Sequence, residues 1–292
     1  MTFPGVLEQG WKTPISSIIP GDFVLSDAWA TKHVTLDDAV SHTTGLPRHD
    51  LSWQHSINGS HTSIQDIVRN LRNLHLTTEP RTIFQYCNIM YLALSHVIET
   101  LTNKPLKTTF KELIWSPLGM NSTYLSLQDA RDSSHYLANG YSWDNTTQSY
   151  GIIAHDTLQE SGAAGIITSV VDHAKWVRSL LYQTPPLSRA AHSDIRTPRV
   201  ISRSNPAQGM DVALYGLGWQ RTSFHGQTLF QHNGESLSFG TVIYWLPELH
   251  YAVVTMGNVV LQANMAGEII ARKLIEDVMG IDKGKRYNLE AE

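Results

Sequence analysis

Residues 229–256 read LFQHNGESLSFGTVIYWLPELHYAVVTM, and this stretch decides the fold class. Its three apolar runs are short and rich in aromatic and β-branched residues, which favours strands over helices. A His-Asn-Gly element and a Pro-Glu pair separate the runs, as is typical of an antiparallel meander. The predicted strands cover residues 229–231, 239–246 and 251–256.

Helical periodicity dominates the sequence before this meander and returns after it. Apolar residues at near 3.6 spacing and N-cap pairs such as Thr35 with Asp38 predict helices over about 35–42, 63–74, 89–101, 169–181 and 265–278. The last helix is expected to turn five apolar residues toward the core: Ile269, Ile270, Leu274, Ile275 and Val278. A mainly helical region (about 35–200), followed by an antiparallel sheet and a C-terminal helix (about 210–280), predicts an α+β fold in a single domain over 1–292.

The composition excludes several classes of partner. Lys and Arg total 22 against 26 Asp and Glu, a net charge of −4, so no basic excess favours nucleic acid or anionic membrane. No apolar run approaches the roughly 18 residues that cross a bilayer. The lone Cys87 excludes an internal disulfide and a cysteine-cluster zinc site. The histidine spacings match no ligand pattern, so we expect no metal, no cofactor and a cytoplasmic protein that binds a small molecule.

Six short motifs place polar side chains beside glycine or proline, where a backbone can approach another group closely. They are SHTTGLP at 41–47, YCN at 86–88, PLGM at 117–120, GAAG at 162–165, YGLGW at 215–219 and HNG at 232–234. In order and spacing they resemble the serine β-lactamase-like family, from about Thr35 to Ile270. That family includes class C β-lactamases, penicillin-binding DD-peptidases, family VIII esterases and some fungal acyltransferases.

The resemblance implies acyl transfer on a small ester or amide. Tyr86 and Asn88 match the family's Tyr-x-Asn element, in which the phenol acts as general base and the amide holds the substrate. A phenol with a pKa near 10 is a poor base at pH 7 unless a nearby cation stabilises the phenolate. We expect His232, when protonated, to contribute that charge.

The resemblance also implies a strand edge along the site. His232-Asn233-Gly234 matches the family's Lys-Thr-Gly element, which is often His-x-Gly in the esterase branch. Asn233 and Gly234 are therefore expected to contact the substrate, and the backbone N–H of Glu235 to be one oxyanion donor. His42 is interpreted as structural, bonding loop carbonyls near 45–47.

The family's nucleophile element, Ser-x-x-Lys, does not occur in the 292 residues; Thr108-x-x-Lys111 is the nearest form and lies in another context. Residues 6–10 resemble the tail of the nucleophile helix, so the serine, the lysine and the family's first two strands are expected upstream of Met1. The last predicted strand would then have an unpaired edge, which favours a homo-oligomer.

Two interpretations remain open. The first is a serine hydrolase or transesterase with a shortened N-terminus. The alternative is a non-catalytic or repurposed family member that uses the site for binding or for proton transfer without an acyl-enzyme. A thiol nucleophile at Cys87 is not favoured, because a residue between two site residues more often points away from them into the core.

Overall fold

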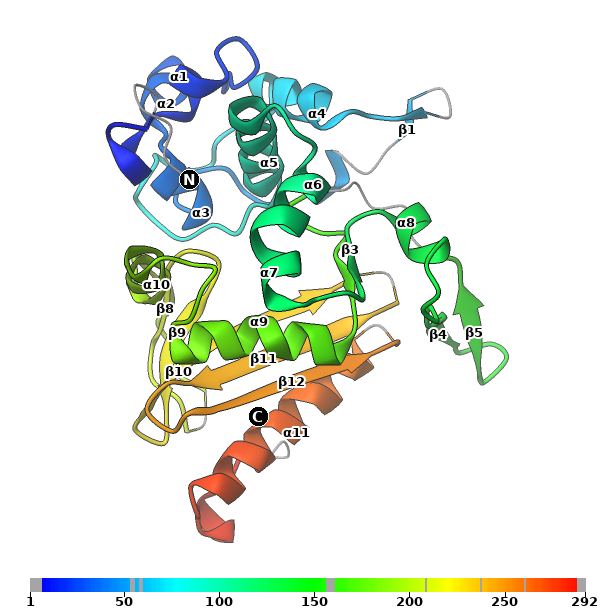
Figure 1. The fold of residues 1–292 in the computed structure, drawn as a ribbon. Coiled ribbons are helices and arrows are strands. Elements are labelled where there is room, and N and C mark those ends of the chain that lie inside the picture. Colours follow the sequence, from blue (N-terminus) through cyan, green and yellow to red (C-terminus); the bar gives the residue numbers. More distant parts are fainter. Residues whose placement is uncertain are drawn as a thin grey trace.

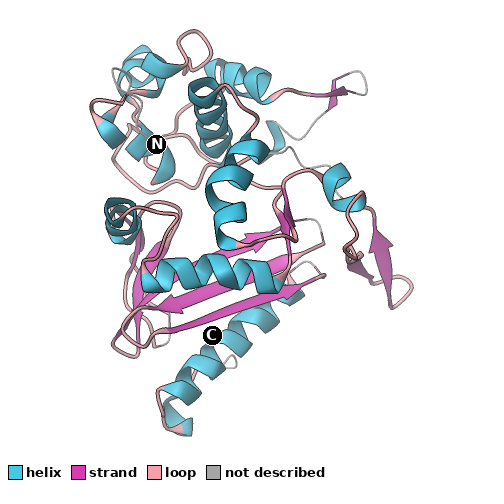
Figure 2. Cartoon of the chain, viewed as in Figure 1, coloured by secondary structure: helices cyan, strands magenta, loops and turns pink. Residues whose placement is uncertain are grey.

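A helical region and a six-stranded antiparallel sheet make up most of the structure, and Figure 1 shows the helical region lying above the sheet. The computed structural model describes residues 7–52, 56–57, 60–155, 161–207, 209–236, 238–259 and 261–287. Figure 2 shows helices on both faces of the sheet. The α+β fold class is therefore confirmed.

The sheet runs in sequence order from one edge to the other, β12-β11-β10-β9-β8-β7. Its strands are β7 (Val200–Arg203), β8 (Ala213–Tyr215), β9 (Gln220–Phe224), β10 (Gln227–Glu235), β11 (Gly240–Leu246) and β12 (Tyr251–Gly257). The three predicted strands correspond to β10, β11 and β12. The sequence prediction missed β7, β8 and β9, which are short and include polar residues on the half-buried side.

The register of β10 leaves part of this strand open. Its pairing with β9 ends at Gln231↔Gln220, whereas its pairing with β11 continues to Glu235↔Gly240. Residues 232–235 therefore lack a strand partner on the β9 side within the described part of the chain. Their backbone groups on that side are available to another molecule.

Alternating side chains of the sheet pack against one helix on each face. On one face, Phe230 and Trp245 pack with Leu180 of α9 (Val170–Tyr182), whose N-cap Ser169 was predicted. On the other face, Leu229 and Tyr244 pack with residues of α11 (Gln262–Val278).

The predicted orientation of α11 is largely wrong. Ile275 is buried, but Ile270, Leu274 and Val278 are 50%, 41% and 53% exposed. The helix turns small residues toward the sheet instead, and a Cβ on Gly267 would lie 2.4 Å from Thr255 Oγ1. Close approach of the helix backbone, not the size of its apolar side chains, sets the orientation.

The helical region is built around α5 (Asn88–Thr102), whose residues Ile89, Met90 and Leu92 are fully buried. The predicted capping box is confirmed, because Thr35 and Asp38 each bond the other's backbone N–H at the start of α3. The other helices are α1 (Ile15–Ile18), α2 (Ala28–His33), α4 (Ile64–Asn70), α6 (Leu106–Phe110), α7 (Ser116–Leu118), α8 (Leu127–Arg131), α10 (Arg189–Arg196) and α3 itself (Leu36–Val40).

Short elements complete the chain. Three two-stranded pairs are β1 with β2 (Ser56–Ile57, Ser60–His61), β3 with β6 (Thr123–Tyr124, Ile167–Thr168) and β4 with β5 (Gly140–Asp144, Ser149–Ile153). Single turns of 3-10 helix lie at Gly10–Lys12, Asp50–Ser52, Leu71–Asn73 and Lys283–Lys285, and a π-helical turn lies at Lys111–Trp115.

Two expectations concern the edges of this fold. Residues 7–9 form turns and not the tail of an α-helix, and Val6 lies outside the described residues. Strand β12 has a strand neighbour on one side only, among the residues that the structure describes.

No helix in the described part of the chain has the length and apolar character that crossing a membrane requires.

Candidate active site

The two side chains expected to be catalytic lie close together, although they are far apart in the sequence. The ring centroids of Tyr86 and His232 are 6.4 Å apart. Tyr86 precedes α5, and His232 lies in β10 where the pairing with β9 has ended. The structure therefore brings the start of α5 to the open end of β10.

His42 holds the segment that carries Tyr86. The backbone oxygen of His42 accepts from the N–H of Gln85 at 2.8 Å, and its Nδ1 accepts from the N–H of Cys87 at 3.0 Å. The His42 ring also lies 4.2 Å from the Tyr86 ring, centroid to centroid. His42 is structural as expected, but its partner is the Tyr86 segment and not the carbonyls near 45–47.

The protonation state of His42 follows from this geometry. Because Nδ1 accepts a hydrogen bond, the proton of the neutral ring resides on Nε2, which has no partner within the described residues. Burial, together with smaller contributions from the charges of His232 and Arg48, lowers the His42 pKa to about 3. Its φ of 58° is left-handed, an unfavourable conformation for a non-glycine residue. His42 is thus a neutral, fully buried and strained residue.

The glycine of the same motif has a packing role. Gly45 has a φ of 81°, and a Cβ there would lie 2.2 Å from the carbonyl oxygen of Thr78. The N–H of Arg81 donates to Thr43 O at 2.6 Å, and its guanidinium forms a two-pronged ion pair with the buried Asp38. Residues 41–47 therefore anchor the loop that leads to Tyr86.

The surroundings of Tyr86 set its acidity. Burial raises the pKa of the Tyr86 phenol, whereas Arg48 lowers it and Asp50 raises it. The Arg48 guanidinium carbon lies 4.7 Å from the centre of the Tyr86 ring. Asp50 binds both Arg48 at 3.0 Å and the side-chain nitrogen of Asn88 at 3.1 Å. Sequence reasoning missed Arg48 and Asp50; their only signal was their place directly after motif 41–47.

His232 is held in a defined tautomer. Its Nδ1 donates to the backbone oxygen of Asn233 at 2.8 Å, and its Nε2 accepts from the hydroxyl of Tyr215 at 3.1 Å. Burial lowers the His232 pKa. Burial therefore disfavours the expected imidazolium, and the hydrogen bond to the Asn233 oxygen opposes this effect only in part. Motif 215–219 supplies Tyr215, a contact that the sequence did not indicate.

The other expected residues of β10 divide by face. The side chains of Asn233 and Glu235 turn toward α11, where they contact Glu268 at 2.8 Å and Asn264 at 3.4 Å. Only their backbones can serve the Tyr86 side. A Cβ on Gly234 would meet no atom closer than 3.6 Å, so packing does not require this glycine. Because Gly234 has no side chain, the strand backbone is left uncovered at this position.

Cys87 faces away from this site. It is fully buried in the cluster that surrounds α5, and burial raises its thiol pKa to about 11. A thiol in that state is a poor nucleophile near pH 7.

The combination of an α+β fold with this ordered set of motifs defines a family. The profile of the beta-lactamase family matches residues 7–274. The chain therefore belongs to the beta-lactamase family.

Individual relatives agree with this assignment. The chain is 38% identical over 280 residues to "Unguisins hydrolase ungD'" of Aspergillus campestris (strain IBT 28561), covering 95% of this chain and 52% of that protein. The chain thus spans about half the length of these curated relatives from Aspergillus.

Solved structures confirm the fold. The octameric penicillin-binding protein homologue from Pyrococcus abyssi has a TM-score of 0.78 at 20% identity, covering 96% of this chain and 63% of that chain. A D-stereospecific amidohydrolase from Streptomyces sp. has a TM-score of 0.72 at 18% identity, with coverages of 89% and 78%.

Proposed function

We propose that this chain supplies the general base and the substrate-binding edge of an acyl-transfer site that hydrolyses a small ester or amide. The observation that carries the proposal is the placement of Tyr86 6.4 Å from His232, beside the open backbone of residues 232–235. The name of the Aspergillus campestris relative, a hydrolase, supports the reaction class.

Each group has a chemical task in this proposal. Tyr86, as phenolate, takes the proton of the attacking serine hydroxyl while the serine oxygen forms a bond to the acyl carbon. The bond from the acyl carbon to the leaving group then breaks, and Tyr86 returns the proton to the departing alcohol or amine. The backbone N–H of Glu235 donates to the oxyanion that develops on the acyl oxygen. Asp50 holds the amide nitrogen of Asn88 and thereby orients the amide that contacts the substrate. Water then releases the acid from the acyl-enzyme.

The nucleophile of this proposal is a serine of a Ser-x-x-Lys segment, which these 292 residues do not contain. Proximity is the requirement, because a base accelerates acyl transfer only when a hydroxyl lies within hydrogen-bond reach. Contacts with the His42 ring and with the Arg48 guanidinium hold the Tyr86 phenol in position.

A second candidate function is binding or proton transfer without an acyl-enzyme. The lowered pKa of His232 and the raised pKa of Tyr86 favour this second candidate, because both shifts disfavour a phenolate at Tyr86 near pH 7.

Covalent labelling separates the two candidates. The chain alone, and the chain fused to a family segment carrying Ser-x-x-Lys, are incubated with a fluorophosphonate probe. We expect a label only on the fusion, at the added serine, and a loss of labelling in the Tyr86→Phe fusion. A folded fusion that takes no label favours the binding function. A label on the unfused chain that survives Tyr86→Phe contradicts the proposed roles.

A further inference from the structure

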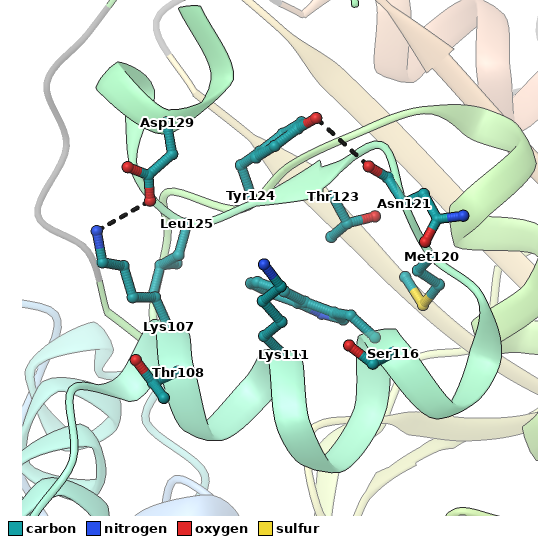
Figure 3. Close-up of a pocket in the computed structure, with 11 residues that line it drawn as sticks. Lys107, Thr108, Lys111, Ser116, Met120, Asn121, Thr123, Tyr124, Leu125 and Asp129 are labelled. Carbon is teal, nitrogen blue, oxygen red and sulfur yellow. Dashed lines mark hydrogen bonds and ion pairs between the residues drawn. The ribbon is translucent and has the colours of Figure 1, made fainter. Parts of the chain in front are cut away.

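A cavity lies away from the Tyr86 site and shares none of the residues described there. Its volume is about 380 Å³, and it lies between the continuous helical segment 106–118 and residues 120–125 (Figure 3). Ligand pockets in proteins span about 300–1,000 Å³, so this cavity suits a compound of amino-acid to dipeptide size.

The cavity has an apolar base. Trp115, Met120 and Leu125 line it, and all three belong to one buried hydrophobic cluster, with exposures of 6%, 6% and 2%. A ligand with an apolar body can bury that body against the indole and the methionine side chain.

The rim carries one uncompensated positive charge. Lys107 is paired with Asp129 at 2.9 Å. Lys111 lines the cavity, and its ammonium group has no ion-pair or hydrogen-bond partner in the described ranges of the chain. Figure 3 shows its side chain extending from the helix toward the strand that holds Thr123 and Tyr124. The rim therefore favours an anion at Lys111.

A π-helical turn produces this arrangement. Lys111–Trp115 is π-helical, and the N–H of Ser116 donates to the backbone oxygen of Lys111. One extra residue per turn places Lys111, Trp115 and Ser116 together on the cavity wall. π-Turns interrupt helices at a cost in hydrogen bonding and occur frequently at functional sites.

The opposite wall is fixed before any ligand binds. The carboxylate of Asp172 in α9 accepts from the N–H of Ser122 and from the hydroxyl of Thr123, at 2.6 and 3.1 Å. Lys175 of the same helix donates to the backbone oxygen of Gly119. A preformed wall lowers the ordering cost of binding.

We propose that this cavity binds an organic carboxylate with an apolar body. The carboxylate pairs with Lys111 and accepts from the Ser116 hydroxyl, and the apolar body lies against Trp115. The same chemistry describes a free small acid and the C-terminal carboxylate of a short peptide.

Ligand-observed NMR on the intact chain tests the proposal with three probes: 3-phenylpropanoate, 3-phenylpropanamide and the peptide Ala-Ala-Phe with a free carboxylate. We expect saturable binding of 3-phenylpropanoate and at least tenfold weaker binding of the amide. Tighter binding of the peptide than of the small acid assigns the peptide terminus as the source; the reverse assigns a free acid.

Lys111→Gln is the variant to measure, and Lys273→Gln, which makes the same charge change at an exposed position of α11, is its control. Lys111→Gln should weaken 3-phenylpropanoate at least tenfold, and Lys273→Gln less than twofold. Both variants should unfold at the wild-type temperature, since both lysines are exposed. The proposal is overturned by equal binding to wild type and Lys111→Gln, by equal binding of acid and amide, or by no saturable binding up to 10 mM.

Discussion

Arg48 lies over the ring of Tyr86, with its guanidinium carbon 4.7 Å from the ring centre. The cation beside the proposed base is therefore an arginine from the loop after α3, and not His232. Arginine keeps its charge at all accessible pH values, whereas a buried histidine does not. The electrostatic support of the phenolate is thus independent of pH near neutrality.

Replacing Arg48 should raise the Tyr86 pKa. Arg48 lowers that pKa in the native protein, so Arg48→Gln is expected to raise it, because the positive charge that favours the phenolate is lost. Titration of ¹³Cζ-labelled tyrosine by NMR measures the shift, with Tyr86→Phe to assign the signal. Arg131→Gln, at an exposed position of α8, is the charge-matched control. An unchanged or lowered Tyr86 pKa would falsify the role of Arg48.

His42 should make stability depend on pH below neutrality. Its native pKa of about 3 lies below its ordinary value of 6.5, so between these values the unfolded chain binds one more proton than the native one. The contribution of the neutral His42 ring to the free energy of unfolding is complete above pH 6.5. As the pH falls below that value, the contribution is lost by about 1.4 kcal/mol per pH unit.

His42→Phe removes the ring that binds this extra proton in the unfolded chain. The variant should be less stable at pH 7, because the Cys87 N–H loses its acceptor, but the difference from wild type should shrink between pH 6 and 4.5. Urea unfolding at several pH values measures it. Exposed His75→Gln is the control and should leave the slope unchanged. A constant difference across this range contradicts the neutral buried imidazole.

Gly45→Ala should destabilise the chain more than a positive φ alone explains. Gly21 has nearly the same φ, 80° against 81°, but has open space where a Cβ would be added. We expect a loss of about 1–2 kcal/mol for Gly21→Ala, the cost of a left-handed residue. Gly45→Ala should lose at least about 2 kcal/mol more, because its Cβ meets a backbone carbonyl. Equal losses of stability for the two variants in thermal unfolding would contradict this prediction, because they would show that the loop at Thr78 moves to accommodate the added Cβ.

Self-association through the open edge of β12 stays a prediction. The exposed side chains of α11, which packs on the same sheet, offer a second contact surface. Leu274 on α11 and Leu113 in the π-turn are both 41% exposed, so they form a matched pair. If copies of the chain meet at α11, Leu274→Glu should increase the monomer fraction, whereas Leu113→Glu should not. Light scattering after size exclusion, over a range of concentrations, measures the fraction. A monomeric wild-type chain at all concentrations contradicts the prediction.

Local patterns predicted the parts of the fold that depend on local physics. The short aromatic and β-branched runs in 229–256 identified three strands, and the Thr35–Asp38 pair identified a helix start, because strand propensity and capping are decided within a few residues. The orientation of α11 could not be predicted this way, since close contact at Gly267 overrides the apolar stripe. A single domain over 1–292 stays a prediction.

The sequence likewise predicted only the part of the candidate site that motif order encodes. Motif order indicated that Tyr86 and His232 belong together, but not the state of either ring. Burial lowers the His232 pKa, and Arg48 reaches Tyr86 from a separate loop. These effects arise from tertiary packing, which residue spacing does not encode.

The central claim is that Tyr86 is the general base of an acyl-transfer site, and the kcat for p-nitrophenyl acetate tests it most directly. The measurement uses the chain fused to a family segment with Ser-x-x-Lys, with Tyr91→Phe as a control at a half-buried neighbouring phenol that donates to Val40 O. Tyr86→Phe should lower kcat by about 10²–10⁴-fold and Tyr91→Phe by less than tenfold. Equal rates for the fusion and its Tyr86→Phe variant, or Tyr86-independent turnover by the unfused chain, would contradict it.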